Sequence, residues 1–144
     1  MTGERDGASL GLETAASLLR EYGIKVTAQR SWIAANLFAR PRHVSADQLY
    51  EAAMREGRGI SRATVYNTLN LFLDRGLLRQ VVVEPNRVFY DSNTSVHYHV
   101  YNRDTGMLSD FSVEEMRLSG LPPLPESTVS MGVDVIVRIR NRRE

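Results

Sequence analysis

Hydrophobic residues recur every three or four positions along most of residues 9–75, a spacing that predicts amphipathic helices. Polar capping residues and glycines divide this stretch into four expected helices, at about residues 10–22, 28–39, 46–55 and 62–75. The expected N-caps are Thr27, Ser45 and Ser61, and the expected stops are Gly23 and Gly76. Gln48 follows Ser45 by three residues, which predicts a capping box at the third helix.

Two runs rich in β-branched residues follow, at 77–83 and 87–91, and the turn-forming residues Glu84-Pro85-Asn86 separate them. This order predicts a β-hairpin. Helices followed by a hairpin are typical of a winged helix-turn-helix, in which the last helix enters the major groove of DNA and the hairpin contacts the adjacent backbone. We therefore expect a winged-helix DNA-binding domain over residues 1–91.

The rest of the chain predicts a thinner lobe after a hinge at 92–95. Expected strands at 96–102 and 107–111 are joined by a turn, and a capping box at Ser112 predicts a short helix to about Ser119. Residues 132–140 mostly alternate apolar and polar positions, which predicts a half-buried strand. About 50 residues make a small domain that a second copy would stabilise, so 96–144 is expected to be a dimerisation domain. The expected fold class is α+β, a winged helix-turn-helix followed by a small α/β dimerisation lobe.

Composition narrows the choice of partners. The 144 residues include no cysteine, which excludes disulfides and thiolate zinc sites, so a metal would bind through histidine and carboxylate. No apolar run approaches the ~20 residues that cross a bilayer, and no signal peptide is evident, so a cytoplasmic protein without a membrane partner is expected. The net charge is +1, with a balance of +3 over residues 1–80 and −2 over residues 81–144. This mild asymmetry fits a DNA-facing first half.

The first turns of the fourth helix carry side chains that suit DNA. Arginine can donate twice to guanine, tyrosine and threonine can contact a thymine methyl, and hydroxyls reach phosphates. The candidates are Arg62, Thr64, Tyr66 and Asn67, with Lys25 and Arg30 for phosphate or minor-groove contacts. From these residues alone, a solvated helix face with ordinary surface cations is an equal alternative.

The three histidines and two aspartates indicate a metal site. His97 and His99 are two residues apart in a strand-like run, so both are expected to project from one face. Two imidazoles with carboxylates suit ferrous iron, manganese or zinc. The candidate ligands are His43, which is expected in a loop, together with Asp91, His97, His99 and Asp110. The alternative is a surface H-x-H pair with an unrelated loop histidine, a turn aspartate and a strand-end charge.

Taken together, these segments resemble the ferric uptake regulator superfamily. The matching stretches are Gly23–Arg30, His43–Tyr50, Ile60–Leu69 and His97–His99, in family order. The resemblance implies a homodimer that binds an inverted-repeat operator in double-stranded DNA and acts as a repressor. It also implies a regulatory metal that sets the orientation of the two lobes. The peroxide-responsive branch uses ligands at the positions that His43, Asp91, His97, His99 and Asp110 fill here.

Two departures from the family pattern change the expectation. The C-x-x-C pairs that hold structural zinc are absent, so we expect no such site. The ending at the 133–140 strand, without a final helix, and the lack of cysteine resemble the iron response regulator branch, some members of which bind haem. The Cys-Pro haem motif is absent here, so Fe²⁺ or Mn²⁺ is the expected ion, with Zn²⁺ as a surrogate and haem as the alternative.

The expected mechanism is a metal-dependent choice of the DNA-competent dimer, and the resemblance also permits the opposite sign, with iron or haem releasing DNA. A redox variant, in which peroxide oxidises a ligand imidazole of iron-loaded protein, would act at His43 or His97. Three further alternatives are a haem-responsive regulator, a winged-helix protein with a vestigial metal site and, remotely, a non-haem iron enzyme. The expectation is that the protein is not an enzyme.

Overall fold

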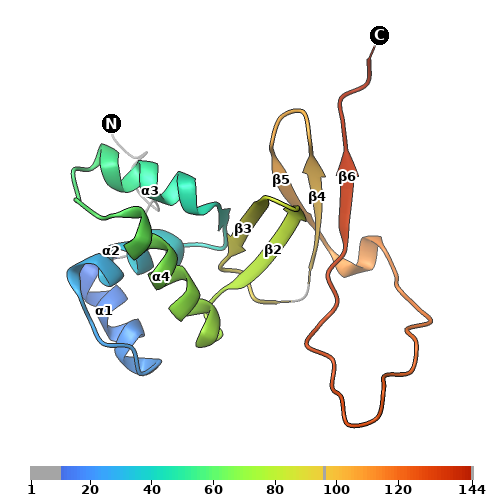
Figure 1. Cartoon of the computed structure of the whole chain (residues 1–144), viewed down its shortest axis with the longest axis horizontal. Helices are drawn as coiled ribbons and strands as arrows, with labels where there is room; N and C mark the ends of the chain where they lie inside the picture. Colours follow the sequence, from blue (N-terminus) through green and yellow to red (C-terminus); the bar gives the residue numbers. More distant parts are fainter. Residues whose placement is uncertain (1–10, 96, 144) are drawn as a thin grey trace. The chain divides into compact units, whose positions relative to one another are not determined.

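The computed structural model describes residues 11–95 and 97–143. These residues divide into two compact units, one up to Thr94 and one from Ser95 onward, whose elements Figure 1 labels. Leu10 and Val96, near which the first helix and the first strand of the second lobe were expected to begin, lie outside the described residues.

Four helices open the first unit, at the positions that the capping pattern predicts. They are α1 (Leu12–Glu21), α2 (Ala28–Leu37), α3 (Ala46–Arg55) and α4 (Arg62–Asp74). The side chains of Thr27 and Ser61 each accept a hydrogen bond from a backbone N–H in the first turn of their helix, at 3.1 Å. The Ser45 capping box is complete. The backbone N–H of Gln48 donates to the Ser45 hydroxyl at 3.1 Å, and the side-chain oxygen of Gln48 accepts from the backbone N–H of Ser45 at 2.9 Å. The caps are confirmed; α2 ends two residues before the expected Ala39.

α4 packs one of its faces against the hydrophobic core of the first unit. Val65, Leu69 and Phe72 of this helix are fully buried among apolar side chains of the other helices. The Phe72 ring lies 5.6 Å from that of Phe38, centroid to centroid. At the far end of α4, the Arg75 guanidinium donates to the carbonyls of Tyr22 and Gly23, at 2.7 and 2.9 Å, and so ties α4 to the end of α1. Burial of one face leaves the opposite face of α4 exposed to solvent.

A three-stranded antiparallel sheet completes this unit, in the order β1-β3-β2. α4 leads into β2 (Arg79–Glu84), which forms the expected hairpin with β3 (Arg87–Asp91) (Figure 1). The short β1 (His43–Val44) was not predicted, because two residues carry no periodic signal. It pairs with the end of β3, so that His43 lies opposite Asp91. Helices followed by this hairpin make a winged helix, as expected.

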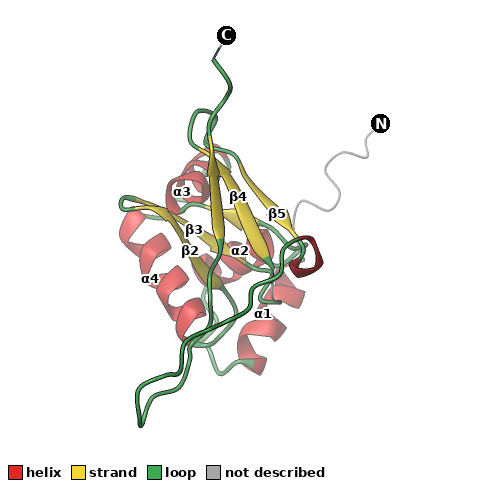
Figure 2. Cartoon of the chain, turned by 90° about the vertical axis from the view of Figure 1, so that its right-hand side faces the viewer, coloured by secondary structure: helices red, strands yellow, loops and turns green. Residues whose placement is uncertain are grey.

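The second unit is built on a sheet of three strands in the order β5-β4-β6, with β4 in the middle (Figure 2). Its strands are β4 (Tyr98–Asn102), β5 (Leu108–Phe111) and β6 (Ile136–Ile139). β5 is antiparallel to β4, and β6 is parallel to it. The helix expected to reach about Ser119 is a single 3-10 turn, η2 (Val113–Glu115). The turn ends because the backbone becomes extended at Met116, with φ −149° and ψ 121°.

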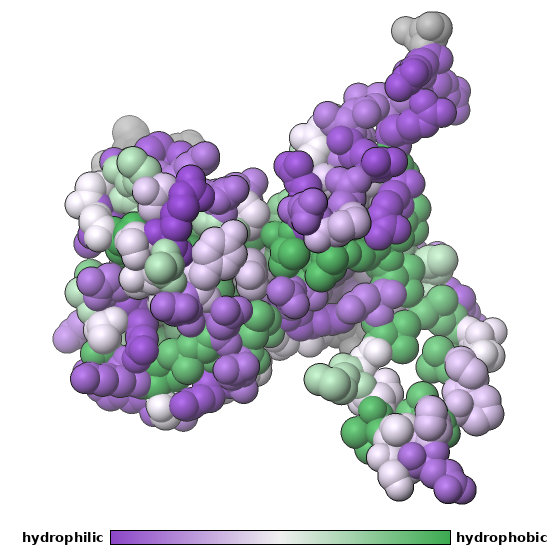
Figure 3. Space-filling view, viewed as in Figure 1, coloured by the Kyte–Doolittle hydropathy of each residue, from purple (hydrophilic) through white to green (hydrophobic). Residues whose placement is uncertain are grey.

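The strand expected over residues 132–140 forms in part, but the expectation that it is half-buried is wrong for the single chain. β6 covers four of those residues, and three of the four are exposed. The strand has β4 on one side, and no described helix of this unit lies over the sheet to cover the apolar positions of β6. Hydrophobic side chains are also exposed along the segment between η2 and β6, which Figure 3 shows in green. They include Leu121, Leu124, Val129 and Met131, which are 68, 55, 86 and 101% exposed.

None of the helices in residues 11–95 and 97–143 has the length and hydrophobicity that a bilayer crossing requires.

Candidate metal centre and nucleic-acid interface

The pairing of β4 with β5 brings a histidine and an aspartate together in the second unit. His99 lies directly opposite Asp110 in the antiparallel register, and side chains opposite each other project from the same face. The Nε2 atom of His99 is 3.4 Å from Oδ1 of Asp110. The imidazole is buried at 4% exposure, whereas the Asp110 side chain is 43% exposed. One face of this sheet therefore carries a buried imidazole nitrogen, which could bind a metal, beside a carboxylate that reaches solvent.

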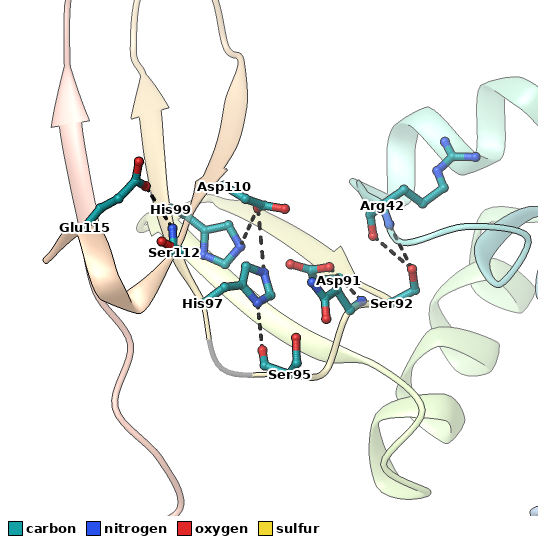
Figure 4. Close-up of polar contacts among 10 residues, drawn as sticks. Arg42, Asp91, Ser92, Ser95, His97, His99, Asp110, Ser112 and Glu115 are labelled. Carbon is teal, nitrogen blue, oxygen red and sulfur yellow. Dashed lines mark hydrogen bonds and ion pairs between the residues drawn. The ribbon is translucent and has the colours of Figure 1, made fainter.

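His97 joins this pair from the residue just before β4. Its Nε2 atom lies 3.7 Å from the same Asp110 oxygen, and its ring centroid is 4.6 Å from that of His99 (Figure 4). Its Nδ1 atom lies 2.7 Å from the carbonyl oxygen of Ser95. A carbonyl can only accept, so Nδ1 carries the proton and a neutral His97 presents the Nε2 lone pair. Such a bond from the remote nitrogen is the usual support of a metal-ligating histidine.

Asp91 is the fourth member of the cluster. One ligand atom from each of Asp91, His97, His99 and Asp110 lies within 4.8 Å of the other three. Asp91 is 1% exposed, and one of its carboxylate oxygens accepts a hydrogen bond from the Asn93 N–H at 2.9 Å. Three residues, 92–94, separate Asp91 from the start of the second unit.

The loop before β1 fixes the segment that carries Asp91. The Ser92 N–H donates to the Arg42 carbonyl at 2.9 Å, and the Arg42 N–H donates to the Ser92 hydroxyl at 3.0 Å. The Arg42 guanidinium also donates to the Asn36 carbonyl, at 3.2 Å. Burial, with a smaller effect of Arg40, lowers the pKa of Arg42. These bonds tie the residue after Asp91 to the end of α2, so the buried carboxylate has a fixed backbone.

His43 lies outside the four-residue group among the described residues. It was expected in a loop but belongs to β1, where its cross-strand neighbour is Asp91. Its ring packs edge-on against Phe89, with 6.2 Å between the ring centroids. The strand pairing explains this placement, because Phe89 and Asp91 alternate on β3 and project from the same face as His43.

This donor set fits a divalent cation. Two imidazoles and two carboxylates supply nitrogen and oxygen ligands without thiolate, a combination that suits first-row ions such as iron or manganese. Three of the four groups are almost fully buried, where an ion would compensate clustered polar atoms. Sequence reasoning missed Ser95 and Ser92, because a backbone carbonyl and a serine in a loop carry no recognisable signal.

The expected DNA-contacting residues lie mostly on the open face of α4. Arg62, Tyr66 and Asn67 are exposed, and Tyr66 keeps 45% of its surface accessible. Thr64 is half-buried, and its hydroxyl accepts a hydrogen bond from the Ser61 hydroxyl at 3.0 Å. Thr64 therefore also helps to close the N-terminal turn of the helix.

The two earlier cations are arranged differently from each other. The Lys25 side chain is exposed just before α2. Arg30 is half-buried, and its guanidinium donates to the Lys25 carbonyl at 2.8 Å. Arg30 thus fixes the backbone that presents Lys25, a role that its position in the sequence did not predict.

Arg62 makes two contacts that sequence reasoning also missed. Its guanidinium pairs with the Asp47 carboxylate and lies over the Tyr50 ring, with 4.2 Å between the guanidinium carbon and the ring centroid. Both partners belong to α3, twelve to fifteen residues earlier in the chain, so only the packing of α3 against α4 creates the arrangement.

Comparison with known sequences agrees with this arrangement of helices, hairpin and cluster. The sequence profile of the Ferric uptake regulator family matches residues 21–119. A peroxide-responsive repressor, PerR, of Staphylococcus aureus is 33% identical over 105 residues, which cover 73% of this chain and 71% of the relative.

Solved structures are similar over most of the chain. The ferric uptake regulator of Pseudomonas aeruginosa, determined with manganese, is 26% identical and gives a TM-score of 0.65. The similarity covers 88% of this chain and 97% of that one. The Vibrio cholerae ferric uptake regulator, at 24% identity, shares the fold with a TM-score of 0.68 over 87% of this chain and 98% of its own.

Proposed function

Because the chain belongs to the ferric uptake regulator family, we propose that it is a metal-responsive transcriptional repressor that binds operator DNA as a homodimer. The observation that carries the proposal is the group of four ligand atoms within 4.8 Å of one another. Asp91, His97, His99 and Asp110 are the proposed ligands, and Fe²⁺ or Mn²⁺ is the proposed ion, with Zn²⁺ as a surrogate. The P. aeruginosa regulator determined with manganese supports this choice.

The ion would act through the positions of its ligands in the chain. Asp91 ends the hairpin of the winged helix, whereas the other three ligands belong to the second unit. Binding of all four groups would restrict the segment between them, residues 92–96, and so favour some arrangements of the two units over others. A ligand shifts such an equilibrium only as far as it prefers one state, typically by ~1–3 kcal/mol. We propose that the preferred state is the one that binds DNA.

Peroxide is a second signal that the same site can serve, as the name of the S. aureus relative suggests. Ferrous iron supplies the reactivity toward peroxide when it is bound. His97 belongs to the four-residue group, whereas His43 lies outside it. We therefore propose His97, rather than His43, as the imidazole that peroxide would oxidise. No observation on the described residues favours the haem-responsive alternative, and we propose no enzymatic activity.

Dimerisation would explain the open surface of the second unit. β6 and the segment before it expose apolar side chains that a single chain does not cover, including Val137 and Ile139 at 37 and 43%. Exposed apolar surface of this kind is typical of a protein–protein contact. We propose that a second copy of the chain covers it, with residues 96–144 as the dimerisation domain.

The test of the proposed function is DNA binding with and without metal. Operator sequences are first enriched from random double-stranded DNA by the protein with Mn²⁺, and their affinity is then measured with Mn²⁺ and with chelator. Mn²⁺ is expected to raise the affinity by about 5- to 150-fold, the range of ~1–3 kcal/mol of coupling. A rise with chelator would support iron-dependent release instead, and an unchanged affinity would remove metal from the switch.

The exposed residues of the winged helix predict two different effects on DNA binding. Tyr66→Ala is expected to cost ~1–3 kcal/mol on the operator and to relax base preference, since the proposal assigns its exposed ring to base contacts. Lys25→Ala is expected to weaken binding equally on operator and random DNA. It should also lower the slope of log affinity against log salt concentration by about one, the loss of one phosphate contact. Titrations on both DNAs at several salt concentrations check this, and equal losses for Tyr66→Ala would contradict base readout.

A further inference from the structure

Two side chains of the neighbouring helix, α3, contact Arg62, the first residue of α4. Asp47, in the first turn of α3, pairs with Nη1 of the guanidinium. The ring of Tyr50, one turn further along α3, lies under the guanidinium, with 4.2 Å between the guanidinium carbon and the ring centroid. Tyr50 is half-buried and packs against the core of the first unit, so the ring offers a fixed surface.

Helix stability does not explain this arrangement. A positive charge in the first turn of a helix lies at the positive end of the helix dipole and is unfavourable there. The Arg62 and Asp47 side chains are 56 and 66% exposed, and ion pairs so exposed contribute little to stability. The arrangement therefore points to a role outside folding.

The contacts leave a defined part of the guanidinium available. Among the described residues, Asp47 is the hydrogen-bond acceptor of Arg62 and uses the Nη1 side of the group. The Nε and Nη2 donors form the other edge of the planar fork, and two donors on one edge match the O6 and N7 acceptors of guanine. A guanidinium that is already held by an ion pair and lies over a ring loses less freedom when its other edge binds a base.

We propose that Asp47 and Tyr50 are positioning residues that orient Arg62 to read a guanine in the major groove. This inference rests on the proposed function, because it requires α4 to face DNA. The Asp47 carboxylate has a second effect. Its negative charge opposes the approach of phosphates, so that Arg62 contributes less to sequence-independent binding of the DNA backbone. The free edge of the guanidinium stays directed at a base. Asp47 would thus set specificity rather than affinity.

The experiment uses the full chain with Mn²⁺ and the DNA enriched by the wild-type protein. Arg62→Ala first identifies the base pair at which discrimination is lost, which is expected to be a G·C pair. Discrimination at that pair is then measured for Asp47→Asn and for Glu51→Gln. Glu51 is the matched control, since it is an exposed acid one turn along α3 and is not the residue that pairs with Arg62 or the one whose ring lies under it.

Asp47→Asn is expected to reduce discrimination at the G·C pair by about tenfold, out of the roughly 10- to 100-fold that a bidentate arginine contact provides. Its affinity for random DNA should rise. Glu51→Gln should show only that rise, because it removes the same charge without releasing Arg62. Asp47→Glu should restore most of the discrimination. Tyr50→Phe, which keeps the ring face, should discriminate better than Tyr50→Leu, with thermal melting checking that both fold.

Three outcomes would overturn the inference. One is that Asp47→Asn and Glu51→Gln discriminate equally at the G·C pair, which would mean that Asp47 acts only through its negative charge and not by orienting Arg62. The second is an Arg62→Ala variant that discriminates at every position as well as the wild type. Both leave the proposed function intact, because the wild-type protein has still selected an operator. Failure of the wild-type protein to enrich any sequence would instead remove the proposed function, and this inference with it.

Discussion

His99→Ala is expected to lower the affinity of the protein for Mn²⁺ by at least about 100-fold. Replacing a residue that only supports a metal ligand already costs 10–100-fold, and His99 is proposed to be a ligand itself. Its imidazole is 4% exposed and its Nε2 atom lies 3.4 Å from the Asp110 carboxylate, so truncation would remove a buried nitrogen from the middle of the proposed ligand set. Calorimetric titration of metal-free protein with Mn²⁺ measures the effect.

Three further variants make this result specific. Asp110→Asn should also weaken Mn²⁺ binding, and its 43% exposed side chain makes a folding defect improbable as the cause. Glu114→Gln is the matched control, since it removes an exposed carboxylate of the same unit outside the four-residue group. His43→Ala should have a smaller effect than His99→Ala, because His43 lies outside that group. Wild-type affinity in His99→Ala would contradict the proposed metal site.

Phe72→Ala is expected to lower the free energy of unfolding of the first unit by about 3–5 kcal/mol. Phe72 is fully buried in the core beneath α4, and its ring lies 5.6 Å from that of Phe38. Truncation would therefore leave a cavity under the helix that is proposed to read DNA. Urea unfolding followed by the fluorescence of Trp32 reports on this unit, because Trp32 is the single tryptophan of the chain and is buried in the same core.

Asn70→Ala supplies the comparison within the same helix. Asn70 is exposed on α4, so its replacement should change the free energy of unfolding by no more than about 0.5 kcal/mol. A Phe72→Ala loss as small as that of Asn70→Ala would mean that α4 is not held by this core. A large loss in Phe72→Ala should also weaken DNA binding, because the helix would no longer be presented in one orientation.

The helices and their starting residues were predictable because their signals are local. Thr27, Ser45 and Ser61 cap helices through bonds to residues three positions away, which a sequence displays directly. The hairpin was predictable for the same reason, since a proline-containing turn separates two β-rich runs. The short 3-10 turn at Val113–Glu115 shows the limit of a cap signal, which starts a helix but does not say how far it continues.

The sequence by itself indicated the candidate residues: three histidines, the aspartates near them, and an arginine and a tyrosine expected on the open face of a capped helix. Tertiary structure alone decided how they are combined. It set His43 in a strand outside the four-residue group, paired Arg62 with Asp47, and left β6 exposed. The physical reason is distance along the chain. Caps and alternation act within about four residues, whereas these contacts depend mainly on how strands pair and helices pack.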